Sequence, residues 1–209
     1  MHLTELASGT GLLLLTATNA PIKPWISRKI VHMGVGTLLI NADVSDPNVV
    51  NGIYSAGAAL TLFTTMNGIK KISDGRIVNG PIKDIGIFGY GLICCLCLVL
   101  SVPYSEMGPL FYADPMGAII GRTIESPKIF GNKTLAGSVA VFGTAYITTL
   151  GDIGDRLGIG IIIAIAELIG GKVDNTIIGL FLIGQYLVEQ GINLPWVKRG
   201  DCATKNKLH

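Results

Sequence analysis

The stretch "GRTIESPKIFGNKTLAGS", Gly121 to Ser138, lies between two long apolar runs of a chain that carries little charge elsewhere. It contains Arg122, Lys128 and Lys133 among glycines, hydroxyl residues and a proline. The flanking runs have the length of helices and few charged residues, so they indicate the fold class. The basic loop between them is the first candidate for a functional site.

Composition predicts the environment of these runs. Of the 209 residues, 49% are hydrophobic and only 14% are charged, and the mean hydropathy is +0.56. Soluble domains usually carry about 25% charged residues. The chain is therefore predicted to be all-α, a polytopic transmembrane bundle that forms one integral membrane domain over residues 1–209. Residues 191–209 would form a polar C-terminal tail.

Apolar runs predict about seven to eight helical segments, some of them short or re-entrant. The runs do not alternate polar and apolar residues, so strands are not expected. The excess of Lys and Arg in one set of loops predicts that the motif loops face the cytosol or stroma. The expected location is a plastid membrane or the endoplasmic reticulum of a eukaryote, or the inner membrane of a bacterium. The segments are approximately 7–20, 30–42, 49–69, 84–102, 106–121, 135–150, 157–171 and 176–190.

The stretch "RKIVHMGVG" is the first polar cluster along the chain. Arg28 and His32 are four residues apart, so a helix would place them on one face, with Lys29 beside them. Two interpretations remain open. The basic residues can anchor a helix end while His32 bonds a neighbouring carbonyl, or all three can line a binding site.

The stretch "YADPMGAIIGR" places one acid among small residues. Asp114, Gly117 and Gly121 have spacings that put them on one helical stripe, which indicates close contact with another helix. Pro115 predicts a helix start directly after the acid. A carboxylate at membrane depth is a functional hypothesis, whereas an Asp that caps a helix near the interface is the structural alternative.

A second acidic stripe repeats the first in "AELIGGKVDN". Glu167 and Asp174 are seven residues apart, with two glycines between them at helical spacing. Acids that face basic loops suit a Mg²⁺ ion bound together with a polyphosphate.

The basic loop would supply the phosphate-binding groups. Thr134 and Ser138 are predicted caps of the next helix, whose N-terminus would then face an anion. Glycines in the loop allow the backbone to approach phosphate oxygens. The loop matches neither the GxxxxGK[ST] nor the GxGxxG motif. The predicted phosphate ligands and loop glycines are Arg122, Lys128, Lys133, Ser138, Gly131 and Gly137.

In this order, the motifs "RKIVH", "DPMGAIIGR", "NKTLAGS" and "AELIGGKVDN" resemble the polyprenol-type lipid kinases. This family includes phytol kinase, dolichol kinase and the CTP-dependent diacylglycerol kinase, and is distantly related to the phosphatidate cytidylyltransferases. The similarity spans roughly residues 28–180. It implies an enzyme that transfers a phosphoryl group from a nucleoside triphosphate, with CTP favoured over ATP, to the hydroxyl of an isoprenoid or lipid alcohol such as phytol.

The resemblance also implies roles for individual residues. Catalysis would involve Asp114, Lys133, His32 and Glu167. A Mg²⁺ cofactor would be bound by Asp114, Glu167 and Asp174. The nucleotide would be bound by Arg122, Lys128, Lys133, Thr134, Gly137, Ser138, Asn175, Arg28 and Lys29.

Three residues depart from the family pattern and keep other functions open. Ala113 and Pro115 flank the first acid where relatives often have glycine, and Val173 stands where many have a second aspartate. One alternative is a catalytically degenerate paralogue that acts as a structural subunit of a larger membrane complex. A lipid-phosphate cytidylyltransferase and a transporter are the others. The predicted partners are a nucleotide, a lipid alcohol and the bilayer, with no nucleic acid.

Overall fold

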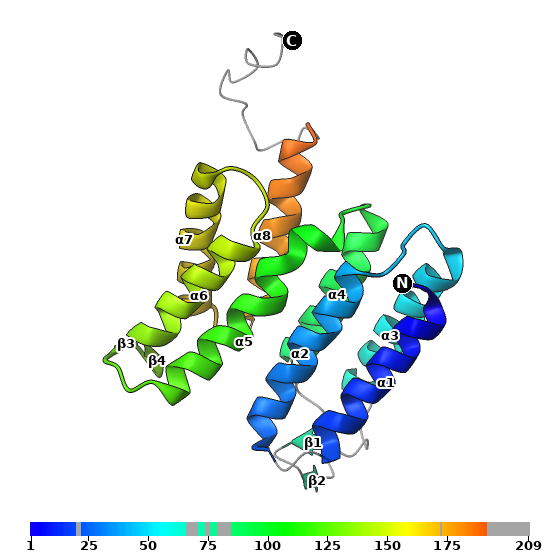
Figure 1. Cartoon of the computed structure of the whole chain (residues 1–209), viewed down its shortest axis with the longest axis horizontal. Coiled ribbons are helices and arrows are strands. Elements are labelled where there is room, and N and C mark those ends of the chain that lie inside the picture. The colour runs from blue at the N-terminus through cyan, green and yellow to red at the C-terminus, as the bar shows by residue number, and fades with distance from the viewer. Residues whose placement is uncertain (20–21, 66–70, 74–75, 79–84, 172, 192–209) are drawn as a thin grey trace.

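The computed structural model describes residues 1–19, 22–65, 71–73, 76–78, 85–171 and 173–191. Within these ranges the chain forms eight α-helices, one short 3₁₀ helix and two antiparallel β-hairpins (Figure 1). The helices are α1 (Leu3–Asn19), α2 (Pro24–Ile40), α3 (Pro47–Thr65), α4 (Ile85–Val99), η1 (Tyr104–Met107), α5 (Gly108–Thr123), α6 (Leu135–Thr148), α7 (Ile153–Gly170) and α8 (Asp174–Glu189). The hairpins are β1 (Lys71–Ser73) with β2 (Arg76–Val78), and β3 (Lys128–Phe130) with β4 (Lys133–Thr134).

The mainly helical prediction is confirmed, and each predicted segment coincides with one α-helix. The expectation of no strands is wrong at the two hairpins, which are too short to leave an alternating pattern in the sequence. No helix in the described ranges combines the length and the apolar character needed to cross a membrane. The transmembrane part of the prediction therefore has no support from these helices. Most of the predicted tail lies outside the described residues.

Local sequence sets several helix boundaries. Prolines begin α2 and α3 at the first helical position, where the missing N–H has no partner to lose. Asp152 caps α7 in a reciprocal capping box with Asp155. Thr134 caps α6, as predicted, by accepting a hydrogen bond from the Gly137 amide. Pro115 does not begin a helix, because α5 already starts at Gly108.

The helices pack as two neighbouring groups (Figure 1). In the first, α1 packs against α2 and α3, and α3 against α4. In the second, α5 packs along α6, and α7 lies between α6 and α8. Contacts of α2 with α5 and of α4 with α8 join the groups. The largest fully buried side chains include Phe111, Ile93, Met107 and Leu110, so the core surrounds the start of α5.

Glycines allow α5 and α6 to approach closely. A methyl group added at Gly137 would lie 3.0 Å from the carbonyl oxygen of Gly117 and 3.3 Å from the Cα of Gly121. Both neighbours are backbone atoms, which cannot move aside without separating the helices. The helix contact predicted from the glycine stripe of α5 is thus confirmed. This contact fixes the position of α6 relative to Asp114, which lies on α5 one turn before Gly117.

Replacing Gly137 with alanine is expected to destabilise the protein, whereas the same change at Gly143 is not. Alanine favours a helix by about 1 kcal/mol over glycine at either site, and a methyl group at Gly143 meets no atom within 4 Å. At Gly137 the forced separation of two helices should outweigh this gain and cost roughly 1–3 kcal/mol. Melting temperatures of the two purified variants test the contact, and equal values would contradict it.

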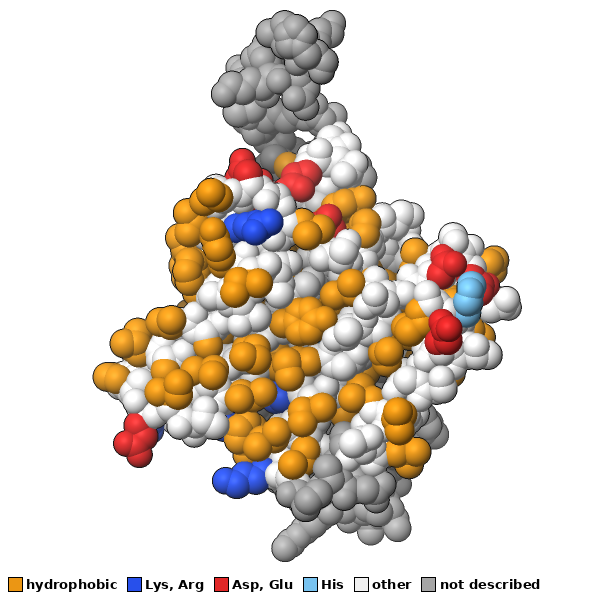
Figure 2. Space-filling view, in the orientation of Figure 1, with side chains coloured by type: hydrophobic (Ala, Val, Ile, Leu, Met, Phe, Trp, Pro, Cys, Tyr) orange, Lys and Arg blue, Asp and Glu red, His pale blue; other side chains and the backbone are white. Residues whose placement is uncertain are grey.

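Many large apolar side chains remain exposed. Examples are Ile147, Ile153 and Leu12, with exposed fractions of 75%, 69% and 68%. In the face shown in Figure 2, hydrophobic side chains spread over the middle, while charged ones lie mainly towards the ends of the helices. Extensive apolar surface marks a site of contact with another protein or with lipid.

Candidate functional site

Three carboxylates from three helices meet inside the second helix group. Asp114 lies in the middle of α5, Glu167 near the end of α7 and Asp174 at the start of α8. One carboxylate oxygen from each lies within 4.8 Å of the others. Their exposed fractions are 6%, 6% and 8%. We call these three residues the acidic cluster.

A lysine and a histidine from α2 reach the acidic cluster. The Lys29 ammonium donates a hydrogen bond to Asp114 Oδ2 at 2.6 Å. His32 Nδ1 lies 3.9 Å from the same oxygen. Because Lys29 and Asp114 are 85 residues apart in the chain, their contact depends on the packing of α2 against α5.

The β3–β4 hairpin brings a second lysine to the cluster. Lys133 on β4 donates a hydrogen bond to Glu167 Oε1, and its ammonium lies 3.7 Å from Asp174 Oδ2. This hairpin joins the end of α5 to the start of α6 (Figure 1). The basic loop and the two acidic stripes therefore meet in space.

Charge and hydrogen bonding leave the cluster incomplete. Within the described residues, two lysine ammonium groups face three carboxylates, and like charges at such separations repel strongly where water is scarce. Glu167 Oε2 and Asn175 Oδ1 are buried acceptors with no hydrogen-bond partner. Buried oxygens normally have a partner. Three clustered carboxylates, one of them with an unpartnered oxygen, fit a hard divalent cation such as Mg²⁺, which prefers oxygen ligands.

The start of α8 also favours negative charge. Asp174 is the first helical residue, and its Oδ1 accepts a hydrogen bond from the Asn175 amide at 2.8 Å. The N-terminus of a helix carries a partial positive charge that stabilises nearby anions. Asn175, the next residue in the chain, is itself buried.

His32 is held by packing as well as by its charged neighbour. Its Nε2 is 3.2 Å from the Leu110 carbonyl oxygen, so the expected bond to a neighbouring carbonyl is present. Its ring meets Tyr90 edge to face at a centroid distance of 4.5 Å. The Tyr90 hydroxyl donates to the His32 carbonyl at 3.3 Å. Sequence reasoning missed Tyr90, which lies in an apolar run without other polar residues.

Three other predicted basic residues are exposed or have an aromatic neighbour. The Arg122 guanidinium stacks 4.5 Å from the centre of the Trp25 ring, a partner that the sequence analysis did not identify. Lys128 is exposed on β3, and its ammonium makes no contact with another side chain in the described part of the chain. Arg28 is exposed on α2, one turn before His32.

The N-terminus of α6 does not present free amides. Leu135 N–H donates to the Pro127 carbonyl at 2.9 Å, and Ala136 N–H donates to Ser126 Oγ at 3.0 Å. Gly137 N–H is taken by Thr134. The expectation that this helix end faces an anion is therefore wrong for its first three amides, because Pro127 and Ser126, which precede the hairpin, and the N-cap Thr134 already accept their hydrogen bonds.

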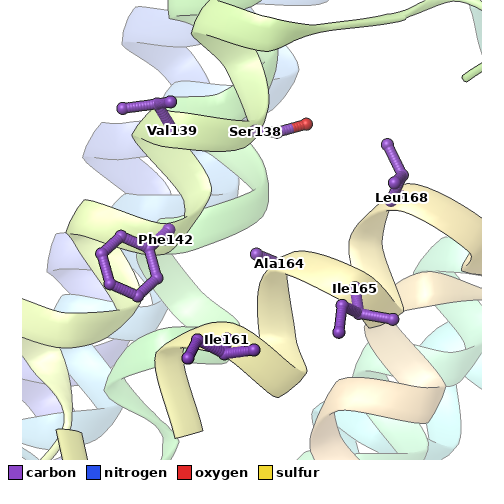
Figure 3. Close-up of a pocket in the computed structure, with 7 residues that line it drawn as sticks. All are labelled: Ser138, Val139, Phe142, Ile161, Ala164, Ile165 and Leu168. Carbon is purple, nitrogen blue, oxygen red and sulfur yellow. The ribbon is translucent and has the colours of Figure 1, made fainter. Parts of the chain in front are cut away.

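The remaining predicted nucleotide ligands have structural surroundings of their own. Thr134 Oγ1 also donates to the Gly121 carbonyl at 3.3 Å, and Gly137 is buried against α5. Ser138 lies one residue further along α6, beside apolar side chains of α7 (Figure 3). The structure thus brings together Asp114, Glu167, Asp174, Lys29, Lys133 and His32. Asn175 directly follows Asp174 and is buried. In the described residues, Arg122, Lys128 and Ser138 make no hydrogen bond or ion pair with this set.

Comparison with known proteins adds no further constraint. No protein-family model, no curated protein and no solved structure matches this chain.

Proposed function

We propose that this protein transfers a phosphoryl group from a nucleoside triphosphate, preferably CTP, to the hydroxyl of an isoprenoid or other lipid alcohol. The observation that carries the proposal is the acidic cluster with Lys133, Lys29 and two unpartnered buried oxygens. Phosphoryl transfer needs mainly alignment and the neutralisation of phosphate charge, so a compact set of carboxylates and ammonium groups is suited to it.

In the proposed reaction the alcohol oxygen attacks the γ-phosphorus, and the bond between that phosphorus and the β-phosphate oxygen breaks. The hydroxyl proton passes to a carboxylate of the cluster. The products are a lipid monophosphate and a nucleoside diphosphate. Lys133 and Lys29 hold phosphate oxygens through charge-assisted hydrogen bonds, while the closely packed helices limit access of water.

The acidic cluster would hold Mg²⁺ through Asp114, Glu167 and Asp174, with Asn175 Oδ1 as a further oxygen ligand. When bound, the ion neutralises charge on the β- and γ-phosphates. Without the ion, Lys29 pairs with Asp114 and Lys133 with Glu167. With the ion bound to these carboxylates, both lysines would turn towards the phosphates of the nucleotide. Asn175 directly follows Asp174 and is buried, and its Oδ1 has no hydrogen-bond partner.

We further propose that the helices lie in a lipid bilayer, with the site near its cytosolic or stromal surface. The supporting observations are the high share of hydrophobic residues, 49%, and the many exposed apolar side chains. A membrane-dissolved alcohol can then reach the site sideways from the lipid, while the nucleotide arrives from water.

A panel of nucleotides and alcohols tests the proposed function. We expect the purified protein in lipid vesicles to phosphorylate a prenyl alcohol with CTP or ATP, and to lose this activity when EDTA removes Mg²⁺. Release of CDP identifies a kinase, whereas release of pyrophosphate from CTP and a lipid phosphate would identify a cytidylyltransferase instead. Absence of turnover with every pair, in a folded preparation, would contradict both and favour a structural subunit.

A further inference from the structure

The His32 ring has one hydrogen-bonding state that its contact with α5 determines. Its Nε2 lies 3.2 Å from the Leu110 carbonyl oxygen, and because a carbonyl can only accept, Nε2 carries the proton. In the neutral ring, Nδ1 is then an unprotonated acceptor. Nδ1 lies 3.9 Å from Asp114 Oδ2, which is beyond hydrogen-bond distance. The hydrogen bond of this side chain to α5 is therefore made to the backbone before Asp114, and not to the carboxylate itself.

The carbonyl that accepts from His32 lies one turn before the acid. Leu110 and Asp114 are four residues apart in α5, the spacing of the hydrogen bond between a carbonyl and an amide in an α-helix. A carbonyl oxygen has two lone pairs and can accept from both groups. Pro115 lies inside α5 and has no N–H, so the Phe111 carbonyl lacks its helical donor. The helix is thus weakened beside Asp114, and His32 supports it there from α2.

Close packing keeps the His32 ring in this position. A methyl group at Gly36, one turn after His32 on α2, would lie 2.4 Å from Phe111 Cβ, so α2 and α5 are in close contact. Tyr90 on α4 meets the His32 ring edge to face at a centroid distance of 4.5 Å, and its ring centre lies 5.7 Å from that of Phe111. The His32 side chain is only 13% exposed. Removing the Tyr90 ring would therefore leave space into which the imidazole could turn.

We propose that His32 and Tyr90 are positioning residues that hold Asp114 in the orientation in which it binds a divalent cation. His32 holds the preceding turn of α5 through the Leu110 carbonyl, and Tyr90 holds the His32 ring. This inference rests on the proposed function, because it specifies how that site keeps one of its metal ligands in place. It differs from the catalytic role that the family resemblance implies for His32, since no proton moves to or from the ring.

Binding of Mn²⁺ tests this role without requiring turnover. Mn²⁺ takes the same oxygen ligands as Mg²⁺, and electron paramagnetic resonance measures the free ion beside purified protein in lipid vesicles without nucleotide. His32→Ala should weaken Mn²⁺ binding by roughly tenfold, the effect of losing a group that orients a metal ligand. A purely structural role would lower the melting temperature and leave the Mn²⁺ affinity unchanged. That result would overturn the inference.

Two amide side chains at position 32 separate positioning from proton transfer. The amide N–H of glutamine lies near the position of Nε2 and can still donate to the Leu110 carbonyl, whereas asparagine is too short to reach it. His32→Gln should therefore bind Mn²⁺ nearly as tightly as the wild type and retain most of its turnover, and His32→Asn should resemble His32→Ala. A neutral amide cannot serve as a general base. Loss of turnover in His32→Gln with normal Mn²⁺ binding would assign proton transfer to the ring and overturn the inference.

Tyr90→Leu tests the second positioning residue, and Tyr112→Phe is its matched control. Tyr90→Leu should weaken Mn²⁺ binding by a smaller factor than His32→Ala, because the hydrogen bond to Leu110 can still form. The Tyr112 hydroxyl lies 2.8 Å from Thr37 Oγ1, within hydrogen-bond distance, and so joins the same two helices, α2 and α5. Its loss should leave Mn²⁺ binding unchanged. An equal loss of Mn²⁺ binding in both tyrosine variants would contradict a specific role of Tyr90.

The same measurements distinguish failure of this inference from failure of the proposed function. Mn²⁺ binding that His32→Ala weakens and His32→Gln restores, without turnover of any alcohol by the wild type, would refute the proposed function and leave the positioning role standing. Turnover by the wild type with normal Mn²⁺ binding in His32→Ala would do the reverse. A wild-type protein that binds no Mn²⁺ would refute the cation site and this inference with it.

Discussion

Replacing Asp114 with asparagine is expected to lower turnover of the lipid alcohol by at least ~100-fold, the effect of removing a metal ligand or a main charge stabiliser. The amide keeps the shape of the side chain and removes its charge. It also separates Lys29 from its ionic partner, which lies 2.6 Å away. The measurement is the rate of lipid phosphate formation with CTP and Mg²⁺ in vesicles, together with the dependence of that rate on Mg²⁺ concentration.

Glu189→Gln is the matched control for this loss of one negative charge. Glu189 is exposed at the end of α8 and accepts a hydrogen bond from Gln185 at 2.7 Å, away from the cluster at the other end of that helix. Its variant should turn over at the wild-type rate. Unchanged turnover in Asp114→Asn, with both variants folded, would remove Asp114 from the site.

The second large effect is expected for Lys133→Gln. Without its ammonium, Glu167 and Asp174 remain as neighbouring buried carboxylates that no other described lysine contacts. The kcat/KM for the nucleotide should fall by about 100-fold, since a charge-assisted contact to phosphate is lost. Stability should fall by roughly 2 kcal/mol, less than for a fully buried pair, because the Lys133 side chain is 34% exposed.

Mg²⁺ separates the electrostatic explanation from general damage to the fold. A bound divalent cation replaces the missing positive charge and stabilises the folded state by mass action. The melting temperature of Lys133→Gln should thus rise more with added Mg²⁺ than that of the wild type. Lys128→Gln removes an exposed lysine from the same hairpin and should melt like the wild type. A Mg²⁺ response equal in all three proteins would contradict a cation site at the cluster.

The helical framework could be predicted because each apolar run is bounded by polar or helix-breaking residues. The run 135–150 corresponds to α6, which Thr134 caps as expected. The prediction that Pro115 begins a helix is wrong, because a proline at a helix start and one inside a helix have similar sequence surroundings. Helix α5 begins earlier, with Pro109 near its first position and Pro115 within it.

The acids of the site could be recognised from their helical spacing. The lysines with which they form ion pairs could not be assigned to them from the sequence. Glycine spacing around Asp114 indicated a close helix contact, which the structure has at Gly137. The partner of Asp114 comes from α2, and no local pattern links residues 85 positions apart. The contacts of Tyr90 and Trp25 could not be predicted for the same reason, because no local pattern marks an aromatic residue in an apolar run as part of a site. Their contacts arise only when α4 and α2 pack against other helices.

The glycine contact between α5 and α6 also governs the geometry of the acidic cluster. Asp114 is carried by α5, and Lys133 directly precedes the N-cap of α6, so the spacing of these two helices also sets the distance between opposite charges. A methyl group at Gly137 would touch no ionic group, yet it would shift the lysine relative to the acids. Uncharged substitutions at this helix contact should therefore impair the proposed phosphoryl transfer before they unfold the bundle.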